Sequence, residues 1–505
     1  MELTNLNIPS WSDLRHWLPE LILCGTFLLA LLGDLVVRGR RIWVPFAISV
    51  FGLATAGAYA IAAAGHGFDM SHTIMGKMIV VDGTAIFFRL LFLFAGLATV
   101  LFAWTSEEIM GPRRENKGEF YALVVLMTAA TMVMAEARNL LMLFLAMEGV
   151  GLVSYVMAGY MRTSLRSTEA SLKYVLFGAV SSAIMLYGLS LLYGMTGSLD
   201  FDGIRTALMS GQVNEFGMLV VVVLVLVGMS YKIAAVPLHY WAPDVYEGAP
   251  TPVAALFSVG PKAAGFALMI RLFYTSFAGS NGNAMQFVQN INWPMLVAVM
   301  SAVTMTYGNL VALRQENVKR MLAYSSIAHV GYILMGFVLL TSAGLASILF
   351  YLLVYTIMNL GAFLVVVAIN NHLKSEQLQD YAGIGFRAPW LGAMMTVFLA
   401  SLTGVPPFAG FVAKFYLFTA VMDQWLFWLV IIAALNSVVS LYYYFKVIKA
   451  MFFTRPAEGA ETSPLRIHWL QYTVLACLAV PTLALGLFFE RFKALADAAV
   501  GLMGG

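Results

Sequence analysis

The segment Tyr231–Pro252 reads YKIAAVPLHYWAPDVYEGAPTP and follows the strongly apolar run Gly217–Gly228. It places Lys232, Pro237 and His239 at the depth of a membrane helix. A lysine near the middle of such a helix costs about 2.5–3.5 kcal/mol on insertion scales, so it should face protein or water. A proline lacks an N–H and clashes with the carbonyl four residues earlier, so the helix should kink or break. Broken helices within lipid line a buried or hydrated path, because freed carbonyls need partners.

A second segment repeats this combination. Ser401–Tyr416 reads SLTGVPPFAGFVAKFY, where Pro406 and Pro407 should free the carbonyls of Leu402 and Thr403. Lys414 follows two turns later. Two broken helices, each with a lysine, predict a proton-translocating membrane subunit that is organised around the two breaks.

The composition supports a membrane protein. Of 505 residues, 61% are hydrophobic and 11% are charged, whereas about a quarter of residues are charged in soluble domains. The net charge of +3 gives no indication of a nucleic-acid partner, because cations of a membrane protein sort by membrane side. Cys24 and Cys477 lie in apolar runs near opposite ends of the chain and suit neither an iron–sulfur cluster nor an obvious disulfide. We therefore expect no redox cofactor in this chain.

Long apolar runs predict an all-α polytopic membrane protein with about 14 transmembrane helices, of which helices 7 and 12 are broken. The runs lie roughly at 18–37, 43–64, 80–104, 119–136, 139–160, 169–194, 216–236, 252–276, 294–313, 321–341, 344–369, 390–422, 424–450 and 468–490. Arginines follow the first run, which is the reverse of the charge order in a cleavable signal peptide, so we expect this run to stay as a helix.

The positive charges predict the orientation. One set of loops contains Arg38, Arg40, Arg41, Arg113, Arg114, Lys117, Arg162, Arg166, Arg314, Lys319, Arg320, Lys374, Arg387, Lys446, Lys449, Arg455 and Arg466. The opposite set contains only Arg15, Lys77, Arg138, Arg205, Arg491 and Lys493. By the positive-inside rule the first set is cytoplasmic, so both termini should lie outside, which is the periplasmic side in a bacterial inner membrane.

An internal repeat is suggested by a few matches. At an offset of 177 residues, Tyr155, Gly159 and Tyr174 align with Tyr332, Gly336 and Tyr351, and at an offset of 169 the first Val-Pro aligns with the second. Chance matches in so apolar a sequence remain an alternative. Five helices per unit would make the second copy inverted in the membrane. We expect an N-terminal three-helix segment (1–118), two five-helix repeats (119–277 and 278–451) and a C-terminal helix (452–505).

Three further ionisable residues fall within the apolar runs. Glu148 lies deep in the fifth run, Lys173 one turn inside the sixth, and Lys262 follows Pro261 in the eighth. Lys173 is near enough to a helix end to extend to the interface instead. Burial disfavours the charged form of an acid or a base, and proximity of the two restores it. A pair of Glu148 and Lys232 would therefore act as a switch, since their separation drives the lysine to release its proton.

Two histidines are candidate proton carriers. His239 lies near the first break and His329 lies in the tenth run; imidazole titrates near neutral pH. Either residue can instead serve only as a hydrogen-bonding group. Metal binding is not expected, because no second ligand lies at a suitable spacing. The tyrosines of Tyr442–Tyr444 are interpreted as packing or lipid-facing residues.

Long motifs carry a resemblance to a known family. The chain resembles the subunit N family of the NADH–quinone oxidoreductases (respiratory complex I) over nearly its whole length. The motifs are LAMEGVGLVSYVMAGY around Glu148, EASLKYVLFGAVSS around Lys173, YKIAAVPLHYWAPDVYEGAPTPV around Lys232, SVGPKAAGFALMIRLF around Lys262, RQENVKRMLAYSSIAHVGYILMG, and SLTGVPPFAGFVAKFYLF around Lys414.

The resemblance implies an antiporter-like subunit with two inverted repeats, embedded among other membrane-arm subunits. It implies that Glu148 and Lys232 form the pair of the first half-channel, with Lys173 as a modulator. It assigns Lys262 to the central link, His239 to its neighbourhood and Lys414 to the second half-channel. It also implies that partner subunits carry FMN, the iron–sulfur clusters and the quinone site.

Other functions remain open. The buried charges also suit a subunit of a cation/proton antiporter complex, a ferredoxin- or deazaflavin-linked relative, or an assembly scaffold. A self-sufficient antiporter would exchange ions alone in liposomes, and a scaffold would pump normally without Glu148 or Lys232.

Overall fold

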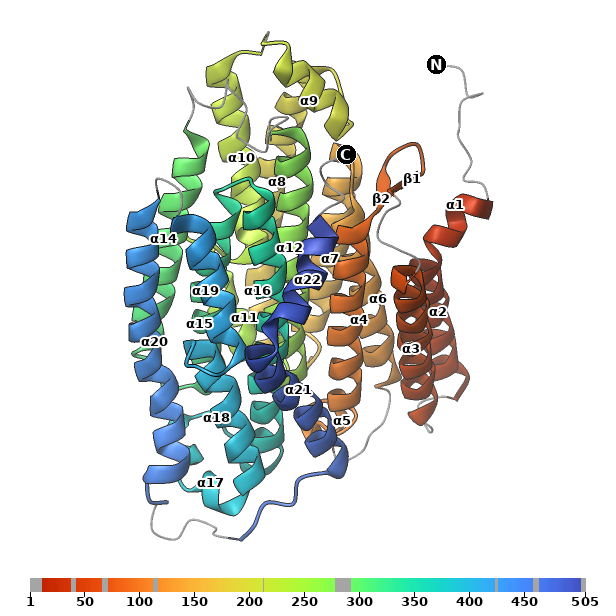
Figure 1. Ribbon diagram of the computed structural model, residues 1–505. Coiled ribbons are helices and arrows are strands. Elements are labelled where there is room, and N and C mark those ends of the chain that lie inside the picture. Colours follow the sequence, from red (N-terminus) through yellow and green to blue (C-terminus); the bar gives the residue numbers. More distant parts are fainter. Residues whose placement is uncertain are drawn as a thin grey trace.

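The computed structural model describes residues 11–37, 42–65, 71–111, 117–211, 213–277, 292–422, 426–456 and 463–500. The described chain is a bundle of long helices with one small β-hairpin near one end (Figure 1). The N-terminal part contains α1 (Trp11–His16), α2 (Leu18–Val37), α3 (Trp43–Gly65), β1 (His72–Ile74), β2 (Ile79–Val81), α4 (Gly83–Ala103) and α5 (Glu107–Met110). The two strands are antiparallel and pair His72 with Val81.

The remaining helices complete the bundle. Up to the middle of the chain they are α6 (Gly118–Glu136), α7 (Leu140–Ala158), α8 (Leu165–Thr196), α9 (Phe201–Met209), α10 (Glu215–Ile233), α11 (Trp241–Gly248) and α12 (Thr251–Ser276). They continue with α14 (Trp293–Ala312), α15 (Val318–Phe337), α16 (Ser342–Leu373), η2 (Leu378–Tyr381), α17 (Ile384–Arg387), α18 (Pro389–Thr403), α19 (Ala409–Met422), α20 (Phe427–Phe453), α21 (Trp469–Leu487) and α22 (Phe489–Val500).

The predicted helical membrane fold is confirmed. Twelve of the described helices are long and apolar enough to cross a membrane, and α18 and α19 are shorter apolar helices. Adding α15 and the α18–α19 pair to these twelve is compatible with the predicted fourteen segments. The hairpin, α1, α5 and α9 were not predicted, because short elements give no long apolar run.

Buried helices occupy the centre of the bundle. The apolar parts of α12 and α16 are 100% and 94% buried, whereas those of α2 and α3 are 28% buried. In Figure 1, α2 and α3 lie on one side, α14 and α20 on the other, and α12 and α16 between them. Nearly every residue of α15 is also buried. The many polar residues of α15 are therefore surrounded by protein.

Both predicted breaks are present. Helix α10 ends at Ile233, Ala234 is left-handed with φ +61°, and the short helix α11 follows. Helix α18 ends at Thr403, Gly404 has φ +88°, and α19 follows. A side chain at Gly404 would also meet Lys414 Cδ at 3.0 Å, so both conformation and space favour glycine there. The separate helix α11 was not predicted from the sequence.

Candidate functional site

Lys262 lies inside the bundle rather than against lipid. It is 2% exposed on α12. Its Nζ donates a hydrogen bond to Ser326 Oγ at 2.6 Å, and it lies 5.5 Å from the centroid of the Tyr246 ring. An ammonium group over an aromatic face is stabilised by the ring quadrupole. The contacts of Lys262 are therefore to neutral groups.

Polar side chains continue from Lys262 along one face of α15. Ser326, His329 and Tyr332 are spaced three residues apart, and such residues lie on one face of a helix. We call the set Lys262, Ser326, His329, Tyr332 and Lys414 the α15 row. His329 is 2% exposed and interacts electrostatically with both lysines of the row. It is therefore placed between the two ammonium groups.

Tyrosine hydroxyls surround the imidazole of His329. Its Nδ1 lies 2.7 Å from the hydroxyl of Tyr351, and its Nε2 lies 3.3 Å from that of Tyr444. The Tyr444 hydroxyl is also hydrogen-bonded to Ser325. Because a hydroxyl both donates and accepts, these contacts suit either tautomer of the ring. Tyr444 is 1% exposed, so it packs inside the bundle and does not face lipid, and its hydroxyl is hydrogen-bonded as well.

Lys414 completes the row at the second break. It is 4% exposed, and its Nζ donates to the carbonyl of Thr403 at 2.8 Å. The same Nζ lies 4.7 Å from the centroid of the Tyr332 ring. Thr403 is one of the two residues whose carbonyls the double proline was predicted to free. Lys414 thus has a hydrogen-bonding role at the break as well as a charge.

The Tyr332 hydroxyl extends the polar network to two further helices. Asn309 of α14 donates from Nδ2 to this hydroxyl at 3.2 Å. Tyr443 of α20 donates to Asn309 Oδ1 at 3.0 Å. The Nδ2 of Asn309 also donates to Asn436 Oδ1 at 3.2 Å. All of these side chains are buried, so the network lies inside the bundle.

Lys232 lies at the end of α10, immediately before the first break. It is 2% exposed, and its Nζ lies 3.3 Å from the carbonyl of Met147. Glu148, the next residue, interacts electrostatically with Lys232. No hydrogen bond or ion pair of Glu148 is present within the described chain, and its side chain is only partly buried. The predicted pair is thus close in space but not in contact.

Helix α12 brings the first break close to the α15 row. A Cβ added at Gly265 would lie 3.4 Å from Lys232 Cγ and 2.6 Å from Ile233 Cγ2. Gly265 is one turn from Lys262 on the same helix, so the two lysines approach each other across α12. His239 is 2% exposed and interacts electrostatically with Lys262. Its Nδ1 has no hydrogen-bond partner in the described part of the chain.

Of the two readings of Lys173, extension to the interface is the one that the structure supports. Its side chain is 38% exposed and forms ion pairs with Glu169 at 2.8 Å and Asp244 at 2.7 Å. Asp244 also pairs with Arg320 at 2.8 Å. Asp244 lies on α11, which follows the first break. It contacts Lys173 because the chain turns at the break and places α11 against α8. Lys173 therefore belongs to a surface ion network and not to the buried row.

The buried lysines differ in their partners. Among the described residues, no carboxylate lies within 4.0 Å of the Nζ of Lys232, Lys262 or Lys414. Lys319, which is 1% exposed, pairs with Glu376 at 2.8 Å. A lysine with a carboxylate partner is held in its charged form. The three lysines without such a partner are free to exist in either protonation state.

No metal site accompanies these residues. Within the ranges that the structure describes, no group of three or more His, Cys, Asp or Glu side chains is arranged to hold a metal ion. The arrangement instead offers amines, an imidazole and hydroxyls, which are groups that accept and release protons.

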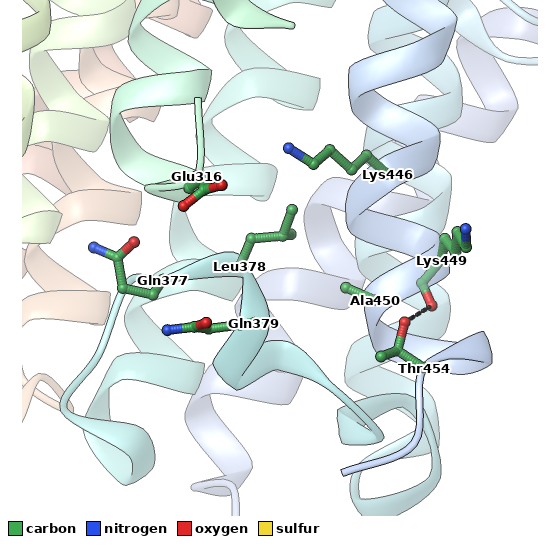
Figure 2. A pocket seen from close by; sticks show the side chains of 8 residues that line it. All are labelled: Glu316, Gln377, Leu378, Gln379, Lys446, Lys449, Ala450 and Thr454. Carbon is green, nitrogen blue, oxygen red and sulfur yellow. Dashed lines mark hydrogen bonds between the residues drawn. The ribbon is translucent and has the colours of Figure 1, made fainter. Parts of the chain in front are cut away.

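A cleft at the surface is separate from this interior network. It has a volume of about 290 Å³ and lies beside α20 and η2 (Figure 2). Lys446 extends from α20 and lies 3.4 Å from the carbonyl of Gln315, and Thr454 donates to the carbonyl of Lys449. The residues that line it are Glu316, Gln377, Leu378, Gln379, Lys446, Lys449, Ala450 and Thr454. None of them belongs to the α15 row.

Several members of the network were not predicted. Ser326 and Tyr332 could have been found from the sequence, because SSIAHVGY places them one turn from His329. Tyr351, Tyr444 and Asn309 come from other helices. Their contacts with the row depend on how the helices pack, and the sequence contains no spacing that indicates them.

Comparisons with known proteins identify relatives of this chain. The family model described as NADH:quinone oxidoreductase/Mrp antiporter, TM matches residues 137–440. NADH-quinone oxidoreductase subunit N 2 of Chloroherpeton thalassium is 41% identical over 97% of this chain and 94% of its own length. NAD(P)H-quinone oxidoreductase subunit 2 of Thermosynechococcus vestitus is 42% identical over 88% of this chain and 83% of its own.

Solved structures share the fold. A chain of respiratory complex I from Thermus thermophilus with bound Aureothin matches with a TM-score of 0.78 and 30% identity, over 95% of this chain and 99% of that chain. A chain of the Mrp complex from Dietzia sp. matches with a TM-score of 0.82 and 24% identity, over 97% of each chain or more. At that identity the second likeness concerns the fold alone.

Proposed function

Because this chain belongs to the NADH:quinone oxidoreductase/Mrp antiporter membrane family, and within it to subunit N of the NADH-quinone oxidoreductases, we propose that it moves protons through Lys232, Lys262 and Lys414. It is a multi-pass membrane-arm subunit of a proton-translocating oxidoreductase. The single observation that carries the residue assignment is the burial of three lysines, 2–4% exposed, with neutral partners only among the described residues.

The α15 row supplies the link between the two breaks. Lys262 and Lys414 each lie next to a member of the row, and His329 lies between them. A proton that leaves Lys262 has an acceptor in the Ser326 hydroxyl and then in the imidazole one turn away. Arrival of a positive charge at His329 disfavours a charged Lys414, because like charges in a medium of low dielectric constant repel strongly. Each transfer can therefore drive the next.

Glu148 and His239 are assigned to the entry side of this path. Glu148 lies near Lys232 and is partly exposed, so it is suited to load that lysine from water. His239 lies near Lys262 and has one buried ring nitrogen without a partner in the described chain. A rotation of the imidazole ring or of the Lys262 side chain would bring Lys262 to this nitrogen as its partner. Lys173 is assigned only an electrostatic influence on the path, through Asp244.

The remaining assignments concern the setting of the subunit. We assign 1–118 to an N-terminal segment, 119–277 and 278–451 to two repeats, and 452–505 to a C-terminal part. The subunit is placed in a bacterial inner membrane with both termini on the periplasmic side, as the distribution of arginine and lysine predicts. Neighbouring subunits of the membrane arm are its partners, and other subunits carry FMN, the iron–sulfur clusters and the quinone site.

Lys262→Met in the assembled complex tests the function. The methionine fills the space of the lysine but cannot carry a proton. Proton uptake by proteoliposomes during NADH oxidation should fall by about a hundredfold, as expected when a positioned acid–base group is lost. Lys446→Met, at the surface cleft of Figure 2, is the matched control and should pump normally. Normal pumping in an assembled Lys262→Met complex would contradict the assignment.

A cation/proton antiporter function is tested separately. The purified chain in liposomes should show no exchange of sodium or potassium for protons, because the coupling to quinone reduction resides in its partners. Ion exchange by the chain alone would support the antiporter alternative.

A further inference from the structure

Two buried carboxylates in the N-terminal helices share one arginine, and the α15 row does not use them. Glu20 lies in the first turn of α2, Arg89 lies in α4, and Glu136 is the last residue of α6. The side chains of Glu20 and Glu136 are 0% exposed and that of Arg89 is 2% exposed. All three lie outside the residues 137–440 that the family model matches. This glutamate–arginine cluster therefore belongs to the N-terminal part of the bundle.

The two carboxyl groups of the cluster share one N–H group of Arg89. Arg89 Nε lies 2.7 Å from Glu20 Oε1 and 2.8 Å from Glu136 Oε1. Arg89 Nη2 donates to Glu20 Oε2 at 2.9 Å, and Trp17 Nε1 donates to Glu136 Oε2 at 2.9 Å. Because the guanidinium Nε carries a single hydrogen, the two Oε1 atoms compete for it.

The charges of the cluster do not balance. Two ionised carboxylates and one guanidinium would leave a net charge of −1 in a site that is almost closed to solvent. An uncompensated buried charge is strongly disfavoured. Both Oε1 atoms lie within 2.8 Å of the same Arg89 nitrogen, and two carboxylates that share one site commonly hold one proton between them. One added proton would neutralise the cluster.

We propose that Glu20 and Glu136 together bind one proton, forming a protonatable site separate from the α15 row. The proton resides on one Oε1 and is donated to the other, while Arg89 balances the remaining carboxylate charge. The reaction is the addition of one proton to one carboxylate oxygen, and no other bond changes.

Two stacked histidines lie near this site. The rings of His16 on α1 and His72 on β1 are 3.9 Å apart, and His16 interacts electrostatically with Arg89. The Nε2 of His72 is buried and has no partner within the described chain. Burial, together with His72 and Arg89, lowers the pKa of His16, so its imidazole is neutral near neutral pH and can accept a proton. The two histidines lie at the end of the bundle where α1 and the hairpin are found (Figure 1).

Other ionisable groups around the site are few. Asp13 and Arg15 of α1 interact with His16, and the Cys24 thiol on α2 interacts with Glu20. Asp13 raises the proton affinity of His16 and Arg15 lowers it. The Asp82–Arg271 pair, on the N-terminal side of α4, is internally neutral. Arg15 acts on His16 and Arg271 is paired with Asp82, so neither cation balances the second carboxylate of the cluster.

Infrared difference spectroscopy of the assembled complex tests this proposal. The wild-type minus Glu136→Gln spectrum at neutral pH should contain the carbonyl stretching band of one protonated carboxylic acid, which shifts in D2O. Glu20→Gln provides a second variant if the first does not assemble, and it should remove the same band. Asp202→Asn is the control, since Asp202 is 53% exposed and pairs with Arg138; it should remove only a carboxylate band. Loss of carboxylate bands alone in both glutamine variants would show that both groups are ionised and would overturn the proposal.

Discussion

The two helix breaks differ in which groups donate hydrogen bonds to the backbone carbonyls beside them. At the first break, the carbonyl of Tyr231 accepts from Trp241 Nε1 at 2.9 Å and from the backbone N–H of Ala234 at 3.1 Å, and Lys232 has one long contact of 3.3 Å. At the second break, Lys414 Nζ itself donates to the carbonyl of Thr403 at 2.8 Å. The lysine precedes the first break and follows the second. A lysine at a break can therefore serve only as a proton carrier, as we infer for Lys232. It can also donate a structural hydrogen bond, as Lys414 does.

The largest effect that would separate the two breaks is expected at Lys232. Lys232→Met should reduce proton uptake during NADH oxidation by about a hundredfold. The variant should assemble normally, because the indole of Trp241 still satisfies the Tyr231 carbonyl. Proton uptake in proteoliposomes and subunit content by mass spectrometry measure the two properties. An assembled variant that pumps at the wild-type rate would refute the role of Lys232.

Lys414→Met should combine a similar loss of pumping with a loss of stability. The methionine leaves the buried Thr403 carbonyl without its donor, and an unsatisfied buried acceptor costs about 1–3 kcal/mol. Thermal dissociation of the purified complex should therefore begin at a lower temperature for Lys414→Met than for Lys232→Met. Equal thermal stability of the two variants would show that the difference between the breaks has no energetic consequence.

Trp241→Phe reverses this test at the first break. It removes the donor to Tyr231, while a phenyl ring can still stack on Tyr174, whose centroid lies 4.3 Å from that of Trp241. Because the Tyr231 carbonyl keeps the N–H of Ala234, the loss of the indole hydrogen bond should destabilise the subunit by only about 0.5–1.5 kcal/mol. Pumping per NADH should fall less than in Lys232→Met. The same thermal dissociation assay measures the effect, and unchanged stability would mean that another donor replaces the indole.

Ser326→Ala should have a moderate effect on transport. It removes the acceptor of the Lys262 hydrogen bond of 2.6 Å, and a hydrogen bond to a charged group contributes about 1.5–3 kcal/mol. We expect proton uptake to fall by about tenfold, since about 1.4 kcal/mol corresponds to a factor of ten. Ser258→Ala is the matched control: both serines donate to a carbonyl three residues earlier, but the Lys262 contact is to Ser326. Equal pumping by the two variants would exclude Ser326 from the path.

The smallest effect is expected at Lys173. Exposed ion pairs contribute about 0–1 kcal/mol, and the side chain of Lys173 is 38% exposed. Lys173→Gln should therefore change proton uptake by less than about twofold at moderate salt. A tenfold loss of proton uptake in the assembled complex would show that Lys173 takes part in proton transfer. It would require Lys173 to act electrostatically on the path through Asp244 and the first break.

Sequence patterns predicted those features of the fold and site that depend on local chemistry. Pro237 and the pair Pro406–Pro407 indicated where α10 and α18 end, because proline cannot continue a helix without losing a hydrogen bond. The burial of Lys232, Lys262 and Lys414 followed from the cost of placing an ammonium group in lipid. These inferences needed no knowledge of neighbouring helices.

Features that depend on packing could not be predicted. The sequence left the burial of Lys173 open, because its partner Asp244 is distant in sequence and approaches it only after α11 forms. Tyr444 gave no sign of its contact with His329, since residues on different helices share no periodic pattern. The Glu20–Arg89–Glu136 cluster was missed for the same reason, because its members are contributed by three separate helices.

Proton uptake by proteoliposomes that contain the His329→Phe complex is the most direct test of the α15 row. Phenylalanine retains the ring but cannot carry a proton, and His329 is placed between Lys262 and Lys414 without a role at either break. We predict that this variant assembles, oxidises NADH slowly and produces no proton gradient. A wild-type gradient from the assembled variant would contradict the claim that protons pass along the row.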